Sequence, residues 1–281
     1  MKMDYQHYSN QTVGLLSFEP KVGHTPSEHA QLLCIPFGGG SPLSFQKLSE
    51  QLEGQLHVKA IDPPGHVRTR GTPFTCVDRM AACYLSELPE ESFRSGYVYG
   101  HSLGAYVALR IAFLLEKQGK PLEGIVLAGC QAPHLRDPNK PLTKMSDEET
   151  YQWIRFLNQS SGEDSTVSDA ERRELFEVFK QAIRSDCQAF ENFDARNIYL
   201  TKTQALVLNG SHDDYVKSSF KADWSNYIKT LDLKVIESAP HLFVASHAQT
   251  VAGLIKKWIT SLPATPVDMD KKDLARVGQS E

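Results

Sequence analysis

The sequence predicts an α/β fold in which a mostly parallel central sheet is flanked by helices. Short apolar runs typical of buried strands alternate with stretches whose apolar residues recur at helical spacing. This alternation indicates strand–helix–strand units, which bring their strands parallel. It stops between residues 130 and 203, where the pattern is purely helical. We therefore expect one sheet domain that carries a helical insertion.

The predicted elements follow one another in a regular order. The expected strands cover residues 31–35, 57–61, 97–99, 124–129, 204–209 and 234–237. The expected helices of the sheet domain cover residues 45–52, 77–88, 105–116 and 247–262. Most strands are thus followed by a helix, as a parallel sheet with helices on both faces requires.

The helical insertion is predicted at about residues 135–200. Ser146 with Glu149, and Ser168 with Glu171, match the capping-box pattern of two helix starts. Ligands of such sheets bind at the carboxyl ends of the strands, so we interpret the insertion as a lid over those ends, in preference to a helical elaboration without a gating role.

Around this insertion the chain divides into three parts. Residues 1–29 form an N-terminal extension, residues 30–262 form the sheet domain, and residues 263–281 form a polar tail that we expect to be disordered.

Composition excludes several other classes of protein. The chain has 281 residues and a net charge of −4, which argues against a nucleic-acid binder. No apolar run approaches the roughly 20 residues that cross a bilayer, and the polar start lacks the apolar core of a signal peptide. The five cysteines are an odd number without metal-ligand spacing, which favours reduced thiols. We expect a cytoplasmic monomer that uses no metal.

A candidate nucleophile lies in the sequence Gly-His-Ser-Leu-Gly at residues 100–104. This string follows a predicted strand and precedes a predicted helix, as the nucleophile elbow of the α/β-hydrolase fold requires. The elbow would expose the Ser102 hydroxyl above the sheet, and the flanking glycines would avoid collisions with neighbouring backbone. The alternative is a glycine-rich turn without catalysis. His101 is expected to pack beside the turn and not to act as the base.

The fold also predicts where the base and its acid should lie, because the chain order is serine, acid, histidine. His241 follows the last predicted strand and is the expected general base. Asp213 and Asp214 follow the preceding strand, and the residues alone leave open which of them orients the imidazole. The other histidines that we weighed are His66, His212 and His247, whose positions do not suit a base.

The oxyanion of an acyl-transfer reaction needs two backbone N–H donors. In this fold one donor is the residue after the nucleophile, Leu103, and the other comes from the loop after the early strand. That loop is the glycine-rich segment 36–41, which lacks the known phosphate-binding and dinucleotide-binding patterns. We expect Phe37 and Gly39 of this loop to contact the substrate.

The chain resembles a known family in three blocks. Residues 33–41 resemble a Pro-aromatic-Ala-Gly-Gly-Ser block, residues 100–105 match its elbow, and residues 240–243 resemble a Gly-His-Phe-Phe block. The family is that of the type II thioesterases of non-ribosomal peptide and polyketide synthases, which includes medium-chain acyl thioesterases. The resemblance implies that Asp213 is the acid, with Asp214 in the place of a proline, and that the N–H of Gly38 is the second oxyanion donor.

The resemblance also implies a reaction. It is the hydrolysis of acyl thioesters on the phosphopantetheine arm of acyl or peptidyl carrier proteins, without a cofactor, and its usual role is to clear misloaded carriers. Apolar residues of the lid, from residues 153–157, would line the acyl channel. The alternatives are release of medium-chain fatty acids, a small-molecule carboxylesterase, and a non-catalytic binding protein on the same fold.

Overall fold

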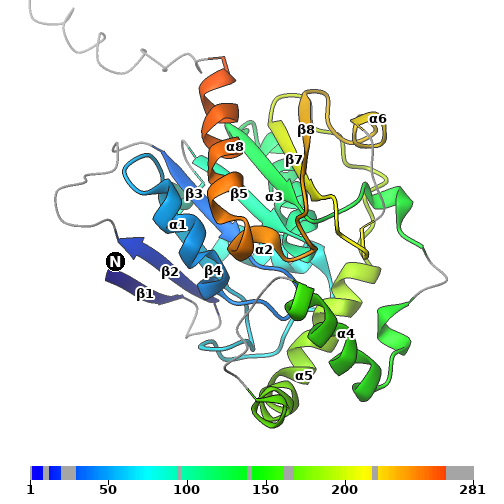
Figure 1. Cartoon of the computed structure of the whole chain (residues 1–281). Helices are drawn as coiled ribbons and strands as arrows, with labels where there is room; N and C mark the ends of the chain where they lie inside the picture. Colours follow the sequence, from blue (N-terminus) through cyan, green and yellow to red (C-terminus); the bar gives the residue numbers. More distant parts are fainter. Residues whose placement is uncertain are drawn as a thin grey trace, which may run out of the picture.

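The computed structural model describes residues 2–8, 13–19, 30–93, 96–137, 141–160, 168–216 and 221–263. Within these residues, an eight-stranded sheet has the strand order β1-β2-β4-β3-β5-β6-β7-β8 (Figure 1). Strands β3 to β8 pair in parallel, whereas β1 and β2 are antiparallel to their neighbours. The strands are β1 (Lys2–Tyr8), β2 (Val13–Glu19), β3 (Gln31–Ile35), β4 (His57–Asp62), β5 (Gly96–His101), β6 (Gly124–Ala128), β7 (Gln204–Gly210) and β8 (Leu231–Ile236).

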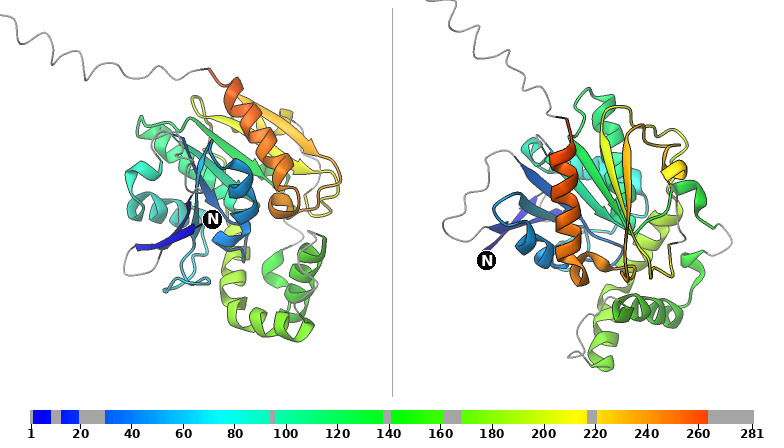
Figure 2. Two further views of the ribbon diagram at one scale, coloured as in Figure 1. Left: turned by 60° about the vertical axis from the view of Figure 1, so that its left-hand side comes forward. Right: turned by 45° about the horizontal axis from the view of Figure 1, so that its top comes forward.

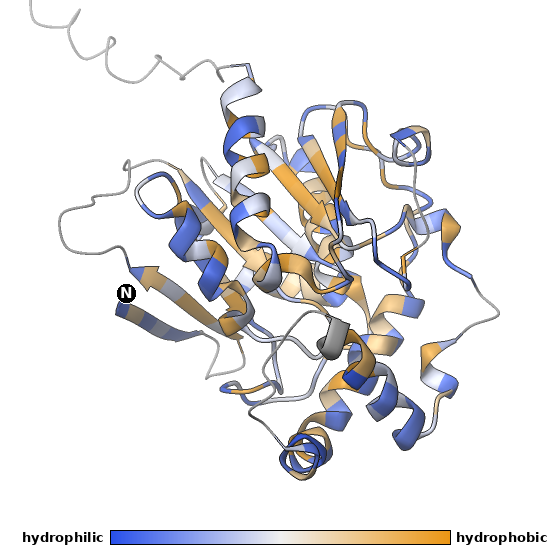
Figure 3. Cartoon of the chain, in the orientation of Figure 1, coloured by the Kyte–Doolittle hydropathy of each residue, from blue (hydrophilic) through white to orange (hydrophobic). Residues whose placement is uncertain are grey.

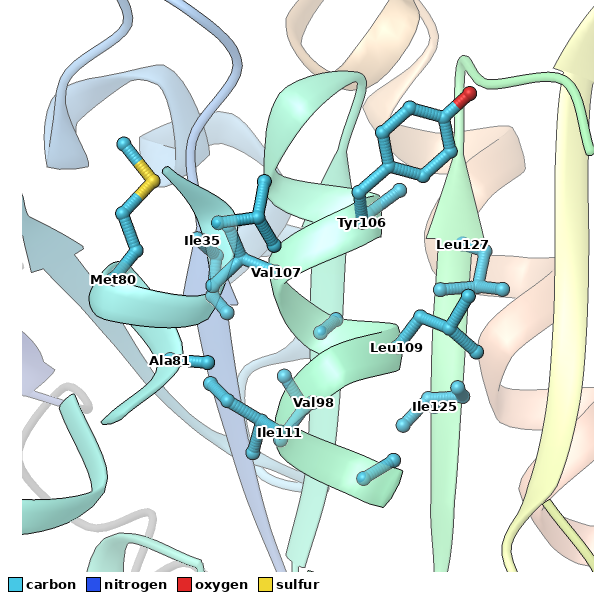
Figure 4. Packing of buried hydrophobic residues seen from close by; sticks show 14 of the residues in the cluster. Ile35, Met80, Ala81, Val98, Tyr106, Val107, Leu109, Ile111, Ile125 and Leu127 are labelled. Carbon is cyan, nitrogen blue, oxygen red and sulfur yellow. The ribbon is translucent and has the colours of Figure 1, made fainter. Parts of the chain in front are cut away.

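Helices cover both faces of the sheet. Helices α2 (Val77–Glu87) and α3 (Leu103–Lys117) pack on one face, and α1 (Gln46–Leu52) and α8 (Ala248–Ser261) pack on the other. Figure 4 shows Val107 and Ile111 of α3 against the strands, and Figure 3 shows how apolar residues concentrate in those strands. The short helices are α6 (Lys221–Trp224), α7 (Phe243–Ser246) and the 3-10 turns Pro42–Phe45, Glu90–Ser92, Pro133–Leu135 and Leu142–Lys144.

Burial on both faces explains why the central strands are apolar throughout. In β3, Leu33 and Ile35 join the core under α2 and α3, and Leu32 and Cys34 join the core under α1 and α8. Successive side chains of a strand point to opposite faces, so each face of β3 must be apolar. The predicted mostly parallel sheet flanked by helices is confirmed by this arrangement.

The predicted helical insertion is present between β6 and β7 as α4 (Asp147–Ser160) and α5 (Asp169–Glu191). Both views of Figure 2 show the two helices together at one end of the sheet. Each helix starts with the predicted capping box. Glu149 Oε2 accepts a hydrogen bond from the Ser146 N–H at 2.7 Å, and Glu171 Oε2 accepts one from the Ser168 N–H at 2.8 Å. These local bonds satisfy backbone donors that the first turn of a helix leaves free.

The N-terminal segment differs from the expected extension, because β1 and β2 belong to the sheet. Strand β2 pairs with β4, with Leu15 opposite Ile61, and the Tyr5 hydroxyl of β1 donates a 2.7 Å hydrogen bond to Asp62. The polar sequence of β1 suits an edge strand that has only one neighbour. The expected disordered tail, apart from its first residue, lies outside the described residues. A membrane-crossing helix, long and apolar enough for a bilayer, is absent from the part of the chain that the structure describes.

Candidate active site

Ser102 lies on the tight turn between β5 and α3, as the elbow pattern predicts. Its φ of 52° lies in a region that non-glycine residues rarely adopt, and the residue is 8% exposed. The flanking glycines are sterically required. A Cβ on Gly100 would lie 2.1 Å from the Gly104 carbonyl oxygen, and a Cβ on Gly104 would lie 2.3 Å from the Ile35 carbonyl oxygen. The strained serine is therefore held where the strand and the helix cross most closely.

The structure brings Ser102 together with His241 and Asp213. His241 follows β8, and its Nε2 lies 3.1 Å from Ser102 Oγ while its Nδ1 lies 2.8 Å from Asp213 Oδ2. Asp213 lies in the loop after β7, and its Oδ1 accepts hydrogen bonds from the backbone N–H groups of Tyr215 and Val216 at 2.9 Å each. Asp214 is exposed. The geometry thus joins His241 to the first aspartate of the pair.

The surroundings of Asp213 favour its ionised form. Burial acts to raise the pKa of the carboxyl group, but the hydrogen bond and charge of His241 and the two backbone N–H donors outweigh it and hold this pKa below the ordinary 3.8. The side chain is fully buried. A buried anion beside the Nδ1–H of His241 both orients the imidazole and stabilises its protonated form.

His101 is neutral and contacts the backbone of His241. Burial and the neighbouring His241 lower the pKa of His101 to about 3. Its Nε2 donates a 2.8 Å hydrogen bond to the His241 carbonyl oxygen, and its Nδ1 accepts one from the Tyr99 hydroxyl at 3.2 Å. His101 therefore fixes the backbone of His241 and cannot compete with it as a base.

A pocket lies over Ser102 and is lined by the Ser102 and His241 side chains. The glycine loop contributes Phe37 and Gly38, and the helical insertion contributes largely apolar side chains. Those apolar side chains are Trp153 and Leu157 from α4 and Ile183, Cys187 and Phe190 from α5. Of residues 153–157, which were expected to line the acyl channel, Trp153 and Leu157 line this pocket. Phe156 is half exposed.

The two expected oxyanion donors border the same pocket. Gly38 and Leu103 line it together with Ser102. Leu103 is the first residue of α3, and the first N–H groups of a helix have no partner within the helix. The glycine loop is closed by a 2.8 Å hydrogen bond from the Gly40 N–H to the Phe37 carbonyl oxygen. Gly39 does not line this pocket, and its N–H donates to Asp186 at 2.8 Å, so the geometry gives it a different role from the expected substrate contact.

Asp186 is a pocket residue that the sequence reasoning missed. It lies on α5 between the apolar residues Ile183 and Cys187, is 3% exposed, and contacts His66 through its carboxylate. A charged residue on the buried face of an amphipathic helix is the signal that could have found it. Of the other candidate histidines, His212 is exposed and His247 lies within hydrogen-bond distance of Ser246.

Metal chemistry has no ready site among the described residues. No group of three or more His, Cys, Asp or Glu side chains there could hold a metal ion. The five cysteines are all free thiols, and Cys34, Cys130 and Cys187 are buried.

The sheet order, the serine elbow and the histidine after the last strand together define an α/β-hydrolase fold. Comparison with known proteins then places the chain more narrowly. The profile of the family described as "Thioesterase domain" matches residues 30–259, so the chain belongs to the thioesterase family.

Individual relatives agree with this assignment. Thioesterase PikA5 of Streptomyces venezuelae is 29% identical over 206 residues, covering 72% of this chain and 71% of its own. The probable anguibactin biosynthesis thioesterase AngT of Vibrio anguillarum is 25% identical and covers 83% of this chain and 92% of its own. Among solved structures, YbtT, a type II thioesterase of the yersiniabactin pathway, superposes with a TM-score of 0.70 at 26% identity, over 88% of this chain and 98% of its own.

Proposed function

We propose that the protein is a serine thioesterase that hydrolyses acyl thioesters from the phosphopantetheine arm of carrier proteins. Ser102 is the nucleophile, His241 the general base, and Asp213 the residue that orients the base. The observation that carries the proposal is the bridging position of His241, 3.1 Å from Ser102 Oγ and 2.8 Å from Asp213 Oδ2. Hydrogen-bond contact between nucleophile and base, with the base oriented by a third group, is what activates a serine hydroxyl.

The reaction follows from these positions in two halves. His241 Nε2 takes the Ser102 proton as Oγ attacks the thioester carbonyl carbon, and the N–H groups of Gly38 and Leu103 bind the resulting oxyanion. The C–S bond then breaks, and the thiol leaves with the proton from His241. In the second half His241 deprotonates a water molecule, whose oxygen attacks the carbonyl carbon of the acyl-serine. The C–Oγ bond then breaks, Ser102 Oγ takes the proton from His241, and the free acid leaves. Asp213 stays ionised throughout and stabilises the protonated imidazole.

The pocket supports an acyl substrate. Its walls include apolar side chains from both insertion helices, and Trp153 of α4 contacts Tyr215, whose ring lies 5.1 Å from the ring of His241. The insertion therefore covers the base as well as the acyl site, which supports a role as a lid. Apolar walls favour a short or medium aliphatic chain, because burying it removes apolar surface from water.

The biological role is proposed from the relatives. PikA5 and AngT are thioesterases, AngT of anguibactin biosynthesis, and YbtT serves a mixed peptide and polyketide pathway. We infer that this chain likewise edits or regenerates misloaded carriers of such a synthase. Release of a medium-chain fatty acid is the alternative within the family, and the rat medium-chain fatty acid synthase thioesterase is 30% identical over 133 residues, 44% of this chain and 49% of its own.

The deciding experiment compares one acyl group on three leaving groups. We expect kcat/KM to be highest with the acyl group on a phosphopantetheinylated carrier, lower on a small thiol, and lowest on an oxygen ester. Equal rates on carrier and thiol, with faster cleavage of oxygen esters, would instead make the protein a carboxylesterase. A fluorophosphonate that fails to label the protein would point to a non-catalytic binding protein.

Two further features belong to this proposal. We propose that the enzyme works in the cytoplasm, which five free thiols support because oxidising compartments favour disulfides. We also propose that it acts as a monomer, which native mass spectrometry would test.

A further inference from the structure

One carboxylate oxygen in the pocket wall joins three separate segments of the chain. Asp186 Oδ2 accepts hydrogen bonds from the Gly39 N–H at 2.8 Å and from His66 Nε2 at 2.9 Å. Asp186 belongs to α5, Gly39 to the glycine loop, and His66 to the turn after β4. Among the described residues, the second oxygen of Asp186 has no hydrogen-bond partner, so both contacts depend on a single atom.

His66 is a buried cation at neutral pH. Its Nδ1 lies 3.0 Å from the Pro64 carbonyl oxygen, and its Nε2 faces the Asp186 carboxylate. A carbonyl oxygen and an ionised carboxylate can only accept, so both ring nitrogens carry protons. Burial acts to lower the pKa of His66, but the charge and hydrogen bond of Asp186, with the Pro64 carbonyl, raise it to about 9. His66 and Asp186 therefore form an ion pair in which each side chain is 4% exposed.

Helix α5 rests directly on the glycine loop at this point. Gly39 has a φ of +72°, and a Cβ there would lie 2.9 Å from Ile183 Cγ1 of α5. A Cβ on Gly38 would lie 3.4 Å from the Cβ of Asp186. The loop thus meets the helix through backbone, and the hydrogen bond from the Gly39 N–H to Asp186 is the polar contact across that junction.

This contact fixes one of the two peptide groups that flank the Cα of Gly38. The Gly38 carbonyl and the Gly39 N–H belong to one planar peptide group, so holding the N–H fixes the orientation of the whole group. The bond from the Gly40 N–H to the Phe37 carbonyl oxygen closes the turn on the other side. The Phe37 carbonyl and the Gly38 N–H belong to one peptide group, which this bond holds, and the Asp186 contact holds the peptide group that follows. The direction of the Gly38 N–H depends on both contacts, because the two peptide groups meet at the Cα of Gly38.

We propose that Asp186 and His66 are positioning residues for the reaction, which hold the glycine loop so that the Gly38 N–H meets the oxyanion. This inference rests on the proposed function, in which Gly38 supplies an oxyanion donor. Since Asp186 is carried by α5, the donor is correctly placed only while the insertion is seated on the loop. Packing of the lid helix α5 on the glycine loop and placement of the Gly38 N–H for the oxyanion therefore occur together.

The test begins with Asp186→Asn, which preserves shape and removes the charge. Without the anion His66 becomes neutral and keeps its Nδ1 proton for Pro64, so its Nε2 becomes an acceptor. The new amide must then turn its N–H₂ group toward His66 and against the Gly39 N–H. We expect kcat to fall about 10- to 100-fold with KM within about threefold, because a misplaced oxyanion donor acts on the transition state.

A second variant separates positioning from a general loss of structure. In the double variant His66→Gln with Asp186→Asn, the Gln N–H donates to the Asn oxygen, which can again accept from Gly39. We expect the double variant to recover at least about a third of the kcat lost in the single variant. His57→Gln is the matched control, because His57 bonds Ser17 at the opposite end of β4. It should keep kcat within about twofold.

Hydrogen–deuterium exchange of the Gly39 amide provides a readout that needs no activity. We expect this amide to exchange at least about tenfold faster in Asp186→Asn than in the parent, with His57→Gln unchanged. A folded Asp186→Asn variant with parental kcat and parental exchange at Gly39 would overturn the inference. A parent that hydrolyses no thioester would instead overturn the proposed function, and the exchange comparison would still decide whether Asp186 holds the loop.

Discussion

His241 Nε2 lies 3.1 Å from Ser102 Oγ, although the two residues are 139 positions apart in the sequence. The parallel sheet makes this possible, because the carboxyl ends of β5 and β8 lie on the same side of the sheet, so the loops that follow them meet there. Asp213 arrives there in the same way after β7. The loops that follow these three strands thus place Ser102, His241 and Asp213 in one chain of hydrogen bonds.

Ser102→Ala removes the hydroxyl that faces His241 and should lower kcat by about 10⁶-fold. The rest of the site would persist, so substrate binding should change little. Steady-state hydrolysis of an acyl thioester measures the loss, and intact mass after fluorophosphonate treatment should show one adduct on the parent and none on the variant. Peptide mapping that finds the adduct on a different serine would contradict the assignment.

Asp213→Asn should lower kcat by about 10⁴-fold, whereas Asp214→Asn should stay within about threefold of the parent. Asp213 contacts His241 Nδ1 at 2.8 Å, and an amide there would favour the wrong imidazole tautomer. Asp214 is exposed and serves as the matched control one position away. The reverse ranking of the two variants would show that the second aspartate orients the base.

Much of the fold could be predicted because its central strands are buried on both faces. The strand β3 was predicted with its observed bounds, since every side chain after Gln31 is buried and apolar. Strand β8 begins at Leu231, three residues before the predicted start, because it lies at the edge of the sheet and three of its residues are exposed. Strand β1, at the opposite edge, was missed for the same reason, whereas β2 was missed although six of its seven residues are buried. An apolar sequence pattern indicates that a strand is buried, and edge strands have few buried side chains.

The candidate site divides along a similar line. Ser102, His241 and Asp213 could be named because each sits at a fixed place relative to a strand end. The pairing of Asp186 with His66 could not, since they lie 120 positions apart and no local pattern pairs a turn with the last turns of a long helix. Their contact depends on how α5 is seated on the sheet, which the sequence pattern of either segment does not contain.

Gly104→Ala should destabilise the protein, whereas Gly253→Ala should stabilise it. A Cβ at position 104 would lie 2.3 Å from the Ile35 carbonyl oxygen, so the elbow must open. Gly253 lies in α8 with nothing within 4 Å of its added Cβ, and alanine there should add about 0.5–1 kcal/mol of helix stability. Thermal unfolding of both variants measures the contrast. Equal melting temperatures would show that the elbow tolerates a side chain.

The ion pair of His66 and Asp186 should make stability depend on alkaline pH. The pKa of His66 rises from 6.5 to about 9 on folding, which corresponds to roughly 3 kcal/mol at about 1.4 kcal/mol per pH unit. This contribution is complete below pH 6.5 and is lost as the pH rises through about 9. Urea unfolding of the parent and of Asp186→Asn should therefore differ most near pH 6 and converge near pH 10. The ionisable groups that interact with the pair are Asp62 on β4, Tyr84 on α2 and Cys187 on α5, and Tyr5 and Arg68 interact in turn with Asp62.

His57 provides a control, because its pKa is shifted in the opposite direction to that of His66. Burial and the nearby Lys59 lower the pKa of His57, outweighing Glu19, so the folded protein disfavours its protonation. The stability linked to His57 is present above pH 6.5 and is lost as the pH falls below that value. His57→Gln should therefore relieve an acid-side loss and leave the alkaline side unchanged. If Asp186→Asn and the parent kept a constant difference in unfolding free energy from pH 6 to 10, His66 would not be the titrating partner of Asp186.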